Sequence, residues 1–201
     1  MGAALLLFAY LLGSVPSGVL LARLAGIDVR RHGSGNIGAT NVARTAGARL
    51  GLITLAADAL KGALPVLLAA RLSTDSALIA GTAVLTVVGH AFPIALRFAG
   101  GKGVATSLGA LAVLCPLGAL WAVAVFLFAF ALDRHVSFAS LLAALAAPVA
   151  VAIEAYPIES LAATLLMVGI VVARHRDNLR RLRAGTEPRF KLPKRQAAPQ
   201  K

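Results

Sequence analysis

Acidic side chains are scarce in this sequence: its 201 residues include eight Asp and Glu against twenty Lys and Arg, a formal net charge of +12. Aromatic residues make up only 5%, and the single cysteine, Cys115, can form no intrachain disulfide. In a soluble protein such a basic excess would suggest nucleic-acid binding. Because aromatic residues are few and no nucleic-acid motif is present, we expect no nucleic-acid partner. The charge instead favours an anionic membrane surface and an anionic substrate.

Several catalytic motifs are also missing. The sequence has no Gly-x-Ser-x-Gly elbow, which disfavours a serine hydrolase. The segment around Lys102 lacks the first Gly and the final Ser or Thr of a Walker A loop. No group of Cys, His and carboxylate residues has the spacing of a metal site, so we expect neither a metal nor another cofactor. The same absence disfavours a phosphatidyl-alcohol transferase, which needs a carboxylate metal motif.

Apolar residues, in contrast, make up 59% of the chain, and the mean hydropathy is +0.83. Soluble domains contain about 45–50%. Because a helix needs about 20 apolar residues to span a bilayer, we predict an all-α integral membrane protein with seven transmembrane helices, some of them short. The first apolar run lacks a basic n-region, so we expect it to be a retained helix. The predicted spans are 3–24, 51–70, 76–96, two short helices within 104–132 that meet near Cys115 and Pro116, 137–154 and 158–173.

The basic residues predict the orientation of these spans. With the N-terminus outside, the inner side holds eight basic residues in its loops and ten more from Arg174 onward, whereas the outer turns hold only Arg71. This asymmetry follows the positive-inside rule. We therefore expect the polar loops and the C-terminus in the cytoplasm, with a single polytopic membrane domain over residues 1–178 and a basic cytoplasmic tail over 179–201.

A small, polar, glycine-rich loop spans residues 33–41 and is followed by Arg44. Glycines permit positive φ and leave backbone amides open, and successive amides form a concave nest that suits an anion. Thr40 or Asn41 is a suitable cap for a helix that begins near Val42 and points its N-terminus at the same anion. The alternative is a flexible turn between two helices. The candidate anion-binding residues of this loop are Ser34, Gly35, Asn36, Gly38, Thr40, Asn41 and Arg44.

A second glycine-rich loop, 100–103, carries Lys102 and precedes another apolar helix, as a phosphate-binding loop does. Two further polar segments, 134–137 and 175–178, fall on the same predicted side of the membrane. Together the four segments are rich in phosphate-binding groups and poor in carboxylates. The sequence therefore predicts a site that neutralises phosphates at the membrane surface and acts mainly by positioning and electrostatic stabilisation.

Two of the predicted spans contain polar residues. Asp58 and Lys61 share a helix face at i, i+3. Because charges inside a membrane face a cavity or one another, they form either a structural ion pair or a polar wall of the site. Pro16 is expected to kink the first span. The small residues around it favour close helix packing over a place for Ser14 or Ser17 in a polar cavity.

Three segments, GSGNIGATNVAR, GHAFPIALRFAGGKGVAT and HRDNLRRLRAGTEPRF, together with SVPSG in the first span, resemble the motifs of the bacterial acyl-phosphate:glycerol-3-phosphate acyltransferase (PlsY) family. They occur in order, and the resemblance covers nearly the whole chain. It implies a seven-helix protein of the bacterial cytoplasmic (inner) membrane with a cytoplasmic active site. The implied reaction transfers a fatty acyl group from acyl-phosphate to the 1-hydroxyl of sn-glycerol 3-phosphate, giving lysophosphatidic acid and inorganic phosphate, without acyl-CoA, acyl carrier protein or metal.

The resemblance also implies roles for single residues. Ser34 and Arg44 are expected in the active site, and Thr40 and Asn41, with neighbouring amides, are expected to hold the phosphate of acyl-phosphate. The residues expected to bind glycerol phosphate are Gly100, Gly101, Lys102 and Gly103, and those that complete the pocket are Ser137, His175 and Asn178.

His175 is the candidate general base, and the leaving phosphate is the alternative proton acceptor. Glu187 is expected to brace the tail through arginines, and His90 to pack or hydrogen-bond at a helix end. His32 and His135 receive no role.

The sequence is also compatible with an alternative function, that of a transporter or channel for phosphorylated solutes. Such a protein would carry polar residues through the depth of its helices and would show internal repeats. The predicted spans are nearly all apolar beyond Asp58 and Lys61, and the sequence shows no repeat. The expected partners are glycerol 3-phosphate, acyl-phosphate and membrane lipid, with the soluble enzyme that makes acyl-phosphate as a further candidate.

Overall fold

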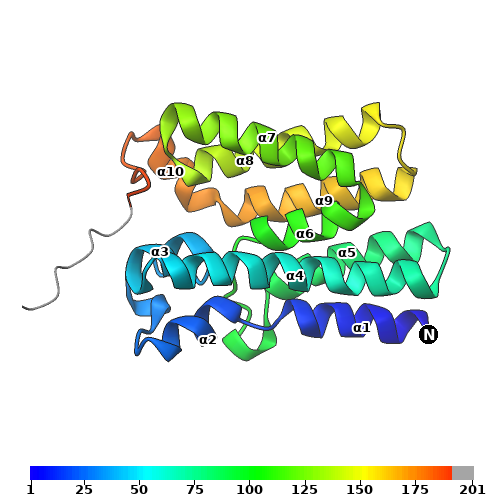
Figure 1. Ribbon diagram of the computed structural model, residues 1–201, viewed down its shortest axis with the longest axis horizontal. Helices are drawn as coiled ribbons and strands as arrows, with labels where there is room; N and C mark the ends of the chain where they lie inside the picture. Colours follow the sequence, from blue (N-terminus) through cyan, green and yellow to red (C-terminus); the bar gives the residue numbers. More distant parts are fainter. Residues whose placement is uncertain (192–201) are drawn as a thin grey trace, which may run out of the picture.

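A computed structural model describes residues 1–191, and the regular secondary structure of this part of the chain is entirely helical (Figure 1). The predicted all-α class is therefore confirmed. Residues 192–201, the end of the predicted basic tail, lie outside the described residues. The helices are α1 (Gly2–Gly13), α2 (Ser17–Leu24), η1 (Val29–Arg31), α3 (Ala39–Ala46), α4 (Ala48–Leu72), α5 (Ser76–Ala91), η2 (Ile94–Leu96), α6 (Val104–Leu114), α7 (Pro116–Asp133), α8 (Val136–Ile153), α9 (Ile158–Arg174) and α10 (Arg176–Arg183).

The first predicted span is broken rather than kinked. Because Pro16 has no N–H to donate, α1 ends at Gly13 and α2 begins at Ser17. Gly13 lies so close to α5 that a Cβ at this position would overlap the Thr86 carbonyl oxygen. The small residues of this segment therefore serve close packing, as predicted. The Ser17 hydroxyl donates to Asp58 of α4.

The long apolar stretch after the second glycine loop forms two helices, as predicted. α6 ends at Leu114, Cys115 is the single residue between the helices, and Pro116 occupies the first position of α7, where its missing N–H removes no helical bond. α6 packs closely on α4, because a Cβ on Gly109 would overlap the Ala59 carbonyl. A Cβ on Gly62 of α4 would likewise overlap the Thr106 carbonyl, so the start of α6 also lies beside α4.

Within residues 1–191, five helical segments are long and apolar enough to span a membrane: Gly2–Leu24, Ala48–Leu72, Ser76–Leu96, Pro116–Asp133 and Val136–Ile153. α9 has 17 residues and is followed by a 59° bend into α10, and α6 has only 11 residues. A count of seven requires both as short spans. The count and the orientation therefore stay predictions.

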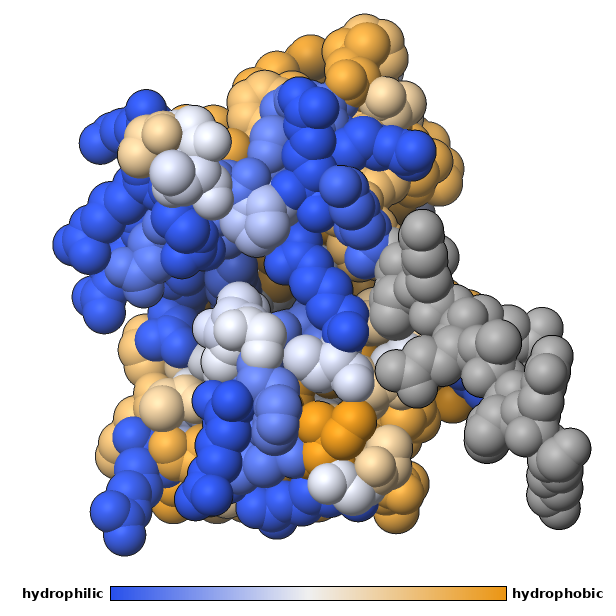
Figure 2. All heavy atoms as spheres, turned by 90° about the vertical axis from the view of Figure 1, so that its left-hand side faces the viewer, coloured by the Kyte–Doolittle hydropathy of each residue, from blue (hydrophilic) through white to orange (hydrophobic). Residues whose placement is uncertain are grey.

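The polar loops gather at one end of the bundle. The turns that join α4 to α5 and α8 to α9 lie at the end opposite α3 and α10 (Figure 1). Viewed onto the α3 and α10 end, the molecule shows a concentration of hydrophilic residues, with hydrophobic surface at its margins (Figure 2). The helices themselves expose large apolar side chains such as Leu60, Trp121 and Leu166, as lipid-facing helices do.

Two of the differences from the predicted boundaries affect segments near the polar loops. α5 ends at Ala91, five residues before the predicted end of its span, because Pro93 has no N–H and disfavours helical backbone in the residue before it. At the other end of the chain, the tail was predicted to begin at residue 179, but that position lies within α10, which continues to Arg183.

Candidate active site

A cavity of about 810 Å³ opens at the polar end of the bundle. It joins segments that are far apart in the sequence: the first glycine loop, the start of α6, the start of α8, the α9–α10 junction and residues 187–190. Most predicted site residues line it, namely Ser34, Asn36, Gly38, Thr40, Asn41, Arg44, Lys102, Gly103, Ser137, His175 and Asn178. Gly35, Gly100 and Gly101 are not among its lining residues.

Asn41 organises the first loop from within. Its Oδ1 accepts the N–H of Ser34 at 2.9 Å, and its Nδ2 donates to the carbonyls of Val29, His32 and Asn36 at 2.9–3.1 Å. The side chain is 2% exposed. Since these bonds use both donors of the amide, the Asn41 side chain stabilises the conformation of the loop.

The predicted cap and nest of this loop are wrong in detail. The helix begins at Ala39, with Gly38 as its N-cap, so neither Thr40 nor Asn41 caps it. The N–H groups of Gly35 and Gly38 bond within the loop, to the His32 carbonyl and Asn36 Oδ1. What remains for an anion is the start of α3, whose first N–H groups have no helical acceptor. Gly38, Ala39 and Thr40 all line the cavity there.

The second loop also uses its glycines differently from the prediction. The N–H of Gly100 donates to the Ala91 carbonyl at 3.2 Å, and that of Gly101 donates to the His90 carbonyl at 3.1 Å. These two amides are therefore not free to bind a phosphate. A Cβ on Gly101 would come within 2.1 Å of His90 Nε2, so this glycine is required for close packing on the end of α5. Of the four loop residues, Lys102 and Gly103 face the cavity.

Lys102 is one of three cations that line the cavity, with Arg44 and Arg181. Burial lowers the pKa of its ammonium from 10.5 to about 8. Glu187 opposes this shift, and the nearby cations Arg181 and Arg44 add to it. An anion bound among these three cations would reverse the shift, because it replaces mutual repulsion with attraction. The arrangement therefore favours a ligand with negative charge.

His175 lies at the α9–α10 junction and is 2% exposed. Its Nδ1 donates to the Val171 carbonyl at 2.7 Å, so the neutral ring carries its lone pair on Nε2. Burial lowers the pKa of the imidazole to about 4; the charge of Lys102 acts the same way, and the Val171 bond and Glu187 oppose it. The ring is therefore neutral near pH 7 and is a weak base.

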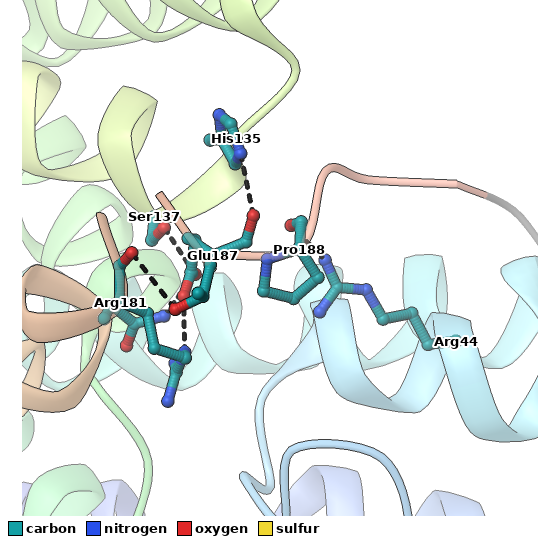
Figure 3. A network of polar contacts seen from close by, with 8 residues as sticks. Arg44, His135, Ser137, Arg181, Glu187 and Pro188 are labelled. Carbon is teal, nitrogen blue, oxygen red and sulfur yellow. Dashed lines mark hydrogen bonds and ion pairs between the residues drawn. The ribbon is translucent and has the colours of Figure 1, made fainter. Parts of the chain in front are cut away.

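Glu187 connects three segments of the site (Figure 3). Its Oε1 accepts from Ser137 Oγ and from Asn178 Nδ2, each at 2.6 Å, and its Oε2 accepts from Arg181 Nε at 2.6 Å. Burial acts to raise the pKa of the Glu187 carboxyl, but these hydrogen bonds outweigh it and hold the pKa below its usual 4.5. The predicted bracing through arginine is confirmed, and the bonds to Ser137 and Asn178 are additional.

The segment that follows Glu187 lies against the first loop. Arg44 Nη2 donates to the Pro188 carbonyl at 3.3 Å, and its guanidinium stands 5.8 Å from the centre of the Phe190 ring. On the other side, His135 Nε2 donates to the Glu187 carbonyl at 2.9 Å (Figure 3). Residues 187–190 are thus part of the site wall. The sequence predicted neither this role for Phe190 nor the contact of His135 with the segment.

An apolar cavity of about 320 Å³ adjoins the polar one. It lies among α6, α7, α8 and α9, and its walls include Leu111, Ala147 and Met167. The residues that line both cavities are Leu55, Val104, Ala105, Phe126 and Ser140. Ser140 is the polar residue at this junction, and sequence reasoning missed it, although it lies three residues after Ser137 on the same helix face.

Asp58, Lys61 and His90 form a buried charged cluster next to the polar cavity. Lys61 Nζ is 2.9 Å from Asp58 Oδ1 and also donates to the Val15 carbonyl at 2.7 Å. His90 Nδ1 lies 3.6 Å from the same carboxylate oxygen, and both Asp58 and His90 line the cavity. The two alternatives for Asp58 and Lys61 therefore hold together: they form an ion pair, and Asp58 is part of the cavity wall.

A model of the family described as glycerol-3-phosphate acyltransferase matches residues 3–185. The chain belongs to the glycerol-3-phosphate acyltransferase family. Proteins of that name from Geotalea daltonii and Aquifex aeolicus are 48% and 41% identical to it, over 93% and 92% of this chain and 96% and 97% of theirs. The resemblance of the three motifs is therefore confirmed.

Two solved structures share the fold. Both are of PlsY, an integral membrane glycerol 3-phosphate acyltransferase, one in its glycerol 3-phosphate form and one in its lysophosphatidic acid form. The first has a TM-score of 0.92 and 40% identity over 94% of this chain and 96% of that one, and the second has 0.90 and 39% over 94% and 95%. The membership of this chain among integral membrane acyltransferases follows from both comparisons.

Proposed function

We propose that this chain transfers a fatty acyl group from acyl-phosphate to the 1-hydroxyl of sn-glycerol 3-phosphate, with lysophosphatidic acid and inorganic phosphate as products. The observation that carries the proposal is the junction of two cavities. A basic cavity large enough for phosphate groups lies next to an apolar cavity among four helices, and the two share five lining residues. A reactant with an anionic head on an apolar chain fits across that junction, and its reactive carbonyl would lie between the two.

The basic cavity offers separate groups for two phosphates. Arg44 and the start of α3 form one side, and Lys102 with the start of α6 forms the other. Each side pairs a cation with open N–H groups at a helix N-terminus. We assign acyl-phosphate to the α3 side and glycerol 3-phosphate to the Lys102 side, as the family resemblance implies. Positioning of the hydroxyl and carbonyl supplies much of the rate, because an acyl-phosphate is already activated.

In the reaction, the 1-hydroxyl oxygen forms a bond to the acyl carbon, and the bond between that carbon and the phosphate oxygen breaks. Phosphate leaves with the electron pair, and the hydroxyl proton must be taken up. The His175 imidazole, with its pKa lowered to about 4, is a weaker base than a phosphate group with a second pKa near 6. We therefore infer that His175 Nε2 accepts the hydroxyl hydrogen bond and orients it, and that the proton ends on the leaving phosphate.

Ser34, Ser137 and Asn178 complete this assignment. We assign to Ser34, which lines the cavity and whose N–H donates to Asn41 of α3, a hydrogen bond to a phosphate oxygen. Ser137 and Asn178 hold Glu187 and, with it, the far wall of the cavity. We further propose seven spans with the N-terminus outside and this cavity at the cytoplasmic face of the bacterial inner membrane. A membrane-impermeant thiol reagent that labels Arg180→Cys from outside intact cells, instead of Ser73→Cys, would contradict that orientation.

The test of the function uses purified protein in detergent with palmitoyl-phosphate and glycerol 3-phosphate. We expect lysophosphatidic acid and phosphate in equal amounts, only when both substrates are present, and unchanged rates with EDTA. Palmitoyl-CoA should not replace palmitoyl-phosphate as donor. Uptake of glycerol 3-phosphate into vesicles without product would support a transporter and contradict the proposal.

A further inference from the structure

The loop that carries Lys102 is held from two sides. On one side, the N–H groups of Gly100 and Gly101 donate to the last carbonyls of α5. On the other side, one side chain of α9 binds the carbonyls of the same two glycines: Arg174 Nε donates to Gly101 O at 3.0 Å, and Arg174 Nη2 donates to Gly100 O at 2.6 Å. The N–H groups of Gly100 and Gly101 thus face α5, and the carbonyl groups of the same residues face α9.

This arrangement fixes the direction of the next peptide group. The N–H of Lys102 belongs to the same planar trans peptide as the Gly101 carbonyl, so the two point in opposite directions. Because Arg174 binds that carbonyl, the Lys102 N–H points away from α9. Arg174 and the two glycines whose carbonyls it binds are not among the residues that line the cavity, so the negative ends of these two peptide dipoles are neutralised outside it. A loop held in this way leaves the N–H and the side chain of Lys102, rather than its carbonyl oxygens, for an anion.

Arg174 is itself firmly placed. Its guanidinium lies 5.5 Å from the centre of the Phe92 ring, a cation–π contact. It is the last residue of α9 and directly precedes His175, which lines the cavity. Arg174 does not line the cavity. It therefore ties the Lys102 loop to the helix end that holds His175 without standing where a substrate would bind.

We propose that Arg174 is a positioning residue that holds the Lys102 loop in its anion-binding conformation and so sets the affinity of the site for glycerol 3-phosphate. The inference rests on the proposed function of the Lys102 side. The planar fork of arginine reaches two carbonyls at once, which the single ammonium of lysine cannot do in the same geometry. A positive charge at position 174 is therefore not enough to hold both carbonyls of the loop.

The kinetic test compares Arg174→Lys and Arg174→Gln with Arg176→Gln, an exposed neighbour at the start of α10. Loss of the two charge-assisted bonds should raise the KM for glycerol 3-phosphate by about 10- to 100-fold. The KM for palmitoyl-phosphate should change less than about threefold, and Arg176→Gln should match the wild type. A normal KM for glycerol 3-phosphate in Arg174→Gln, or equal rises for both substrates, would overturn the proposal.

A second measurement reads the loop without any substrate. Hydrogen exchange of the peptide that covers residues 100–103 should be faster in Arg174→Gln than in the wild type and in Arg176→Gln, at equal melting temperature. Unchanged exchange would overturn the proposal. If the wild type fails to acylate glycerol 3-phosphate, the proposed function fails; if the wild type is active and the Arg174 variants keep their KM values, only this inference fails.

Two glycine substitutions test the contact of the loop with α5. Gly101→Ala forces a Cβ against His90 Nε2, whereas Gly169→Ala in α9 meets nothing within 4 Å. Gly101→Ala should therefore reproduce the KM increase and the faster exchange of the Arg174 variants, and Gly169→Ala should leave both unchanged. A wild-type KM in Gly101→Ala would show that the position of the loop does not set the affinity.

Discussion

The hydroxyl of Ser137 donates a 2.6 Å hydrogen bond to the carboxylate of Glu187, fifty residues later in the chain. This bond fastens residues 187–190 to the start of α8, while the carbonyl of the next residue, Pro188, accepts from Arg44 on the opposite side of the cavity. A segment that looks like part of a tail in the sequence thereby becomes a wall of the site. The first prediction follows from it.

Glu187→Gln should lower the melting temperature at pH 7, because the neutral amide accepts weaker hydrogen bonds from Arg181, Asn178 and Ser137. The pKa of Glu187 is lowered in the folded protein. Its stabilising effect is therefore complete above the unfolded pKa of about 4.5 and is lost as the pH falls through the lower folded value. Thermal scans of both proteins from pH 7 to pH 3 measure the difference.

The control is Glu154→Gln, an exposed residue at the other end of the bundle. The gap in melting temperature between wild type and Glu187→Gln should close as the pH falls below about 4.5, and Glu154→Gln should show no gap at any pH. A gap that is constant with pH would mean that the charge of Glu187 does not contribute to stability.

Lys102→Ala should raise the KM for glycerol 3-phosphate by about 30- to 100-fold, since it removes a charge-assisted contact to a phosphate. The KM for palmitoyl-phosphate should rise much less, because that phosphate is assigned to the Arg44 side. Steady-state kinetics with each substrate varied in turn measure the two values, with Arg49→Ala, exposed in the first turn of α4, as the control. Equal increases for both substrates would show that the two phosphate positions are assigned incorrectly.

The lowered pKa of Lys102 predicts a pH dependence for binding. The free enzyme loses the lysine charge as the pH rises through about 8, so the KM for glycerol 3-phosphate should increase above that pH. Lys102→Arg keeps its charge at any such pH. Its KM, although higher at pH 7, should therefore stay level between pH 7 and pH 9.5. A rise of the same size in Lys102→Arg would assign the titration to another group.

His175→Gln should lower kcat by about tenfold and leave clear residual activity, because the leaving phosphate can take up the proton without an imidazole. A true general base would contribute about 10²- to 10⁴-fold. The measurement is kcat at saturating concentrations of both substrates, with the melting temperature as a check on folding. Activity at background in a protein with an unchanged melting temperature would identify His175 as the base.

The helical class and the membrane location were predictable from the sequence because they depend on the number and length of apolar runs. The gathering of the polar loops at one end of the protein was equally predictable, since Arg44 and Lys102 do line one cavity. Helix ends were harder: Pro93 explains the early end of α5 only once the loop after it is seen to fold back onto His90.

Individual roles within the loops could not be predicted from residue types. Glycine suggests an open amide, yet Gly100 and Gly101 are needed for close packing on α5. Asn41 has side-chain donors that suit a phosphate group, but it donates them to backbone carbonyls instead. Arg174 is one of ten basic residues near the C-terminus, and nothing in the sequence distinguishes the one that binds two carbonyls. These outcomes depend on which groups the fold brings together.

The most direct test of the central claim follows the oxygen atom of the attacking hydroxyl. Glycerol 3-phosphate labelled with ¹⁸O at its 1-hydroxyl is incubated with palmitoyl-phosphate and the purified protein, and both products are analysed by mass spectrometry. Direct acyl transfer predicts that the label is retained in the ester of lysophosphatidic acid and is absent from the released phosphate. Phosphate release without labelled lysophosphatidic acid would contradict the account.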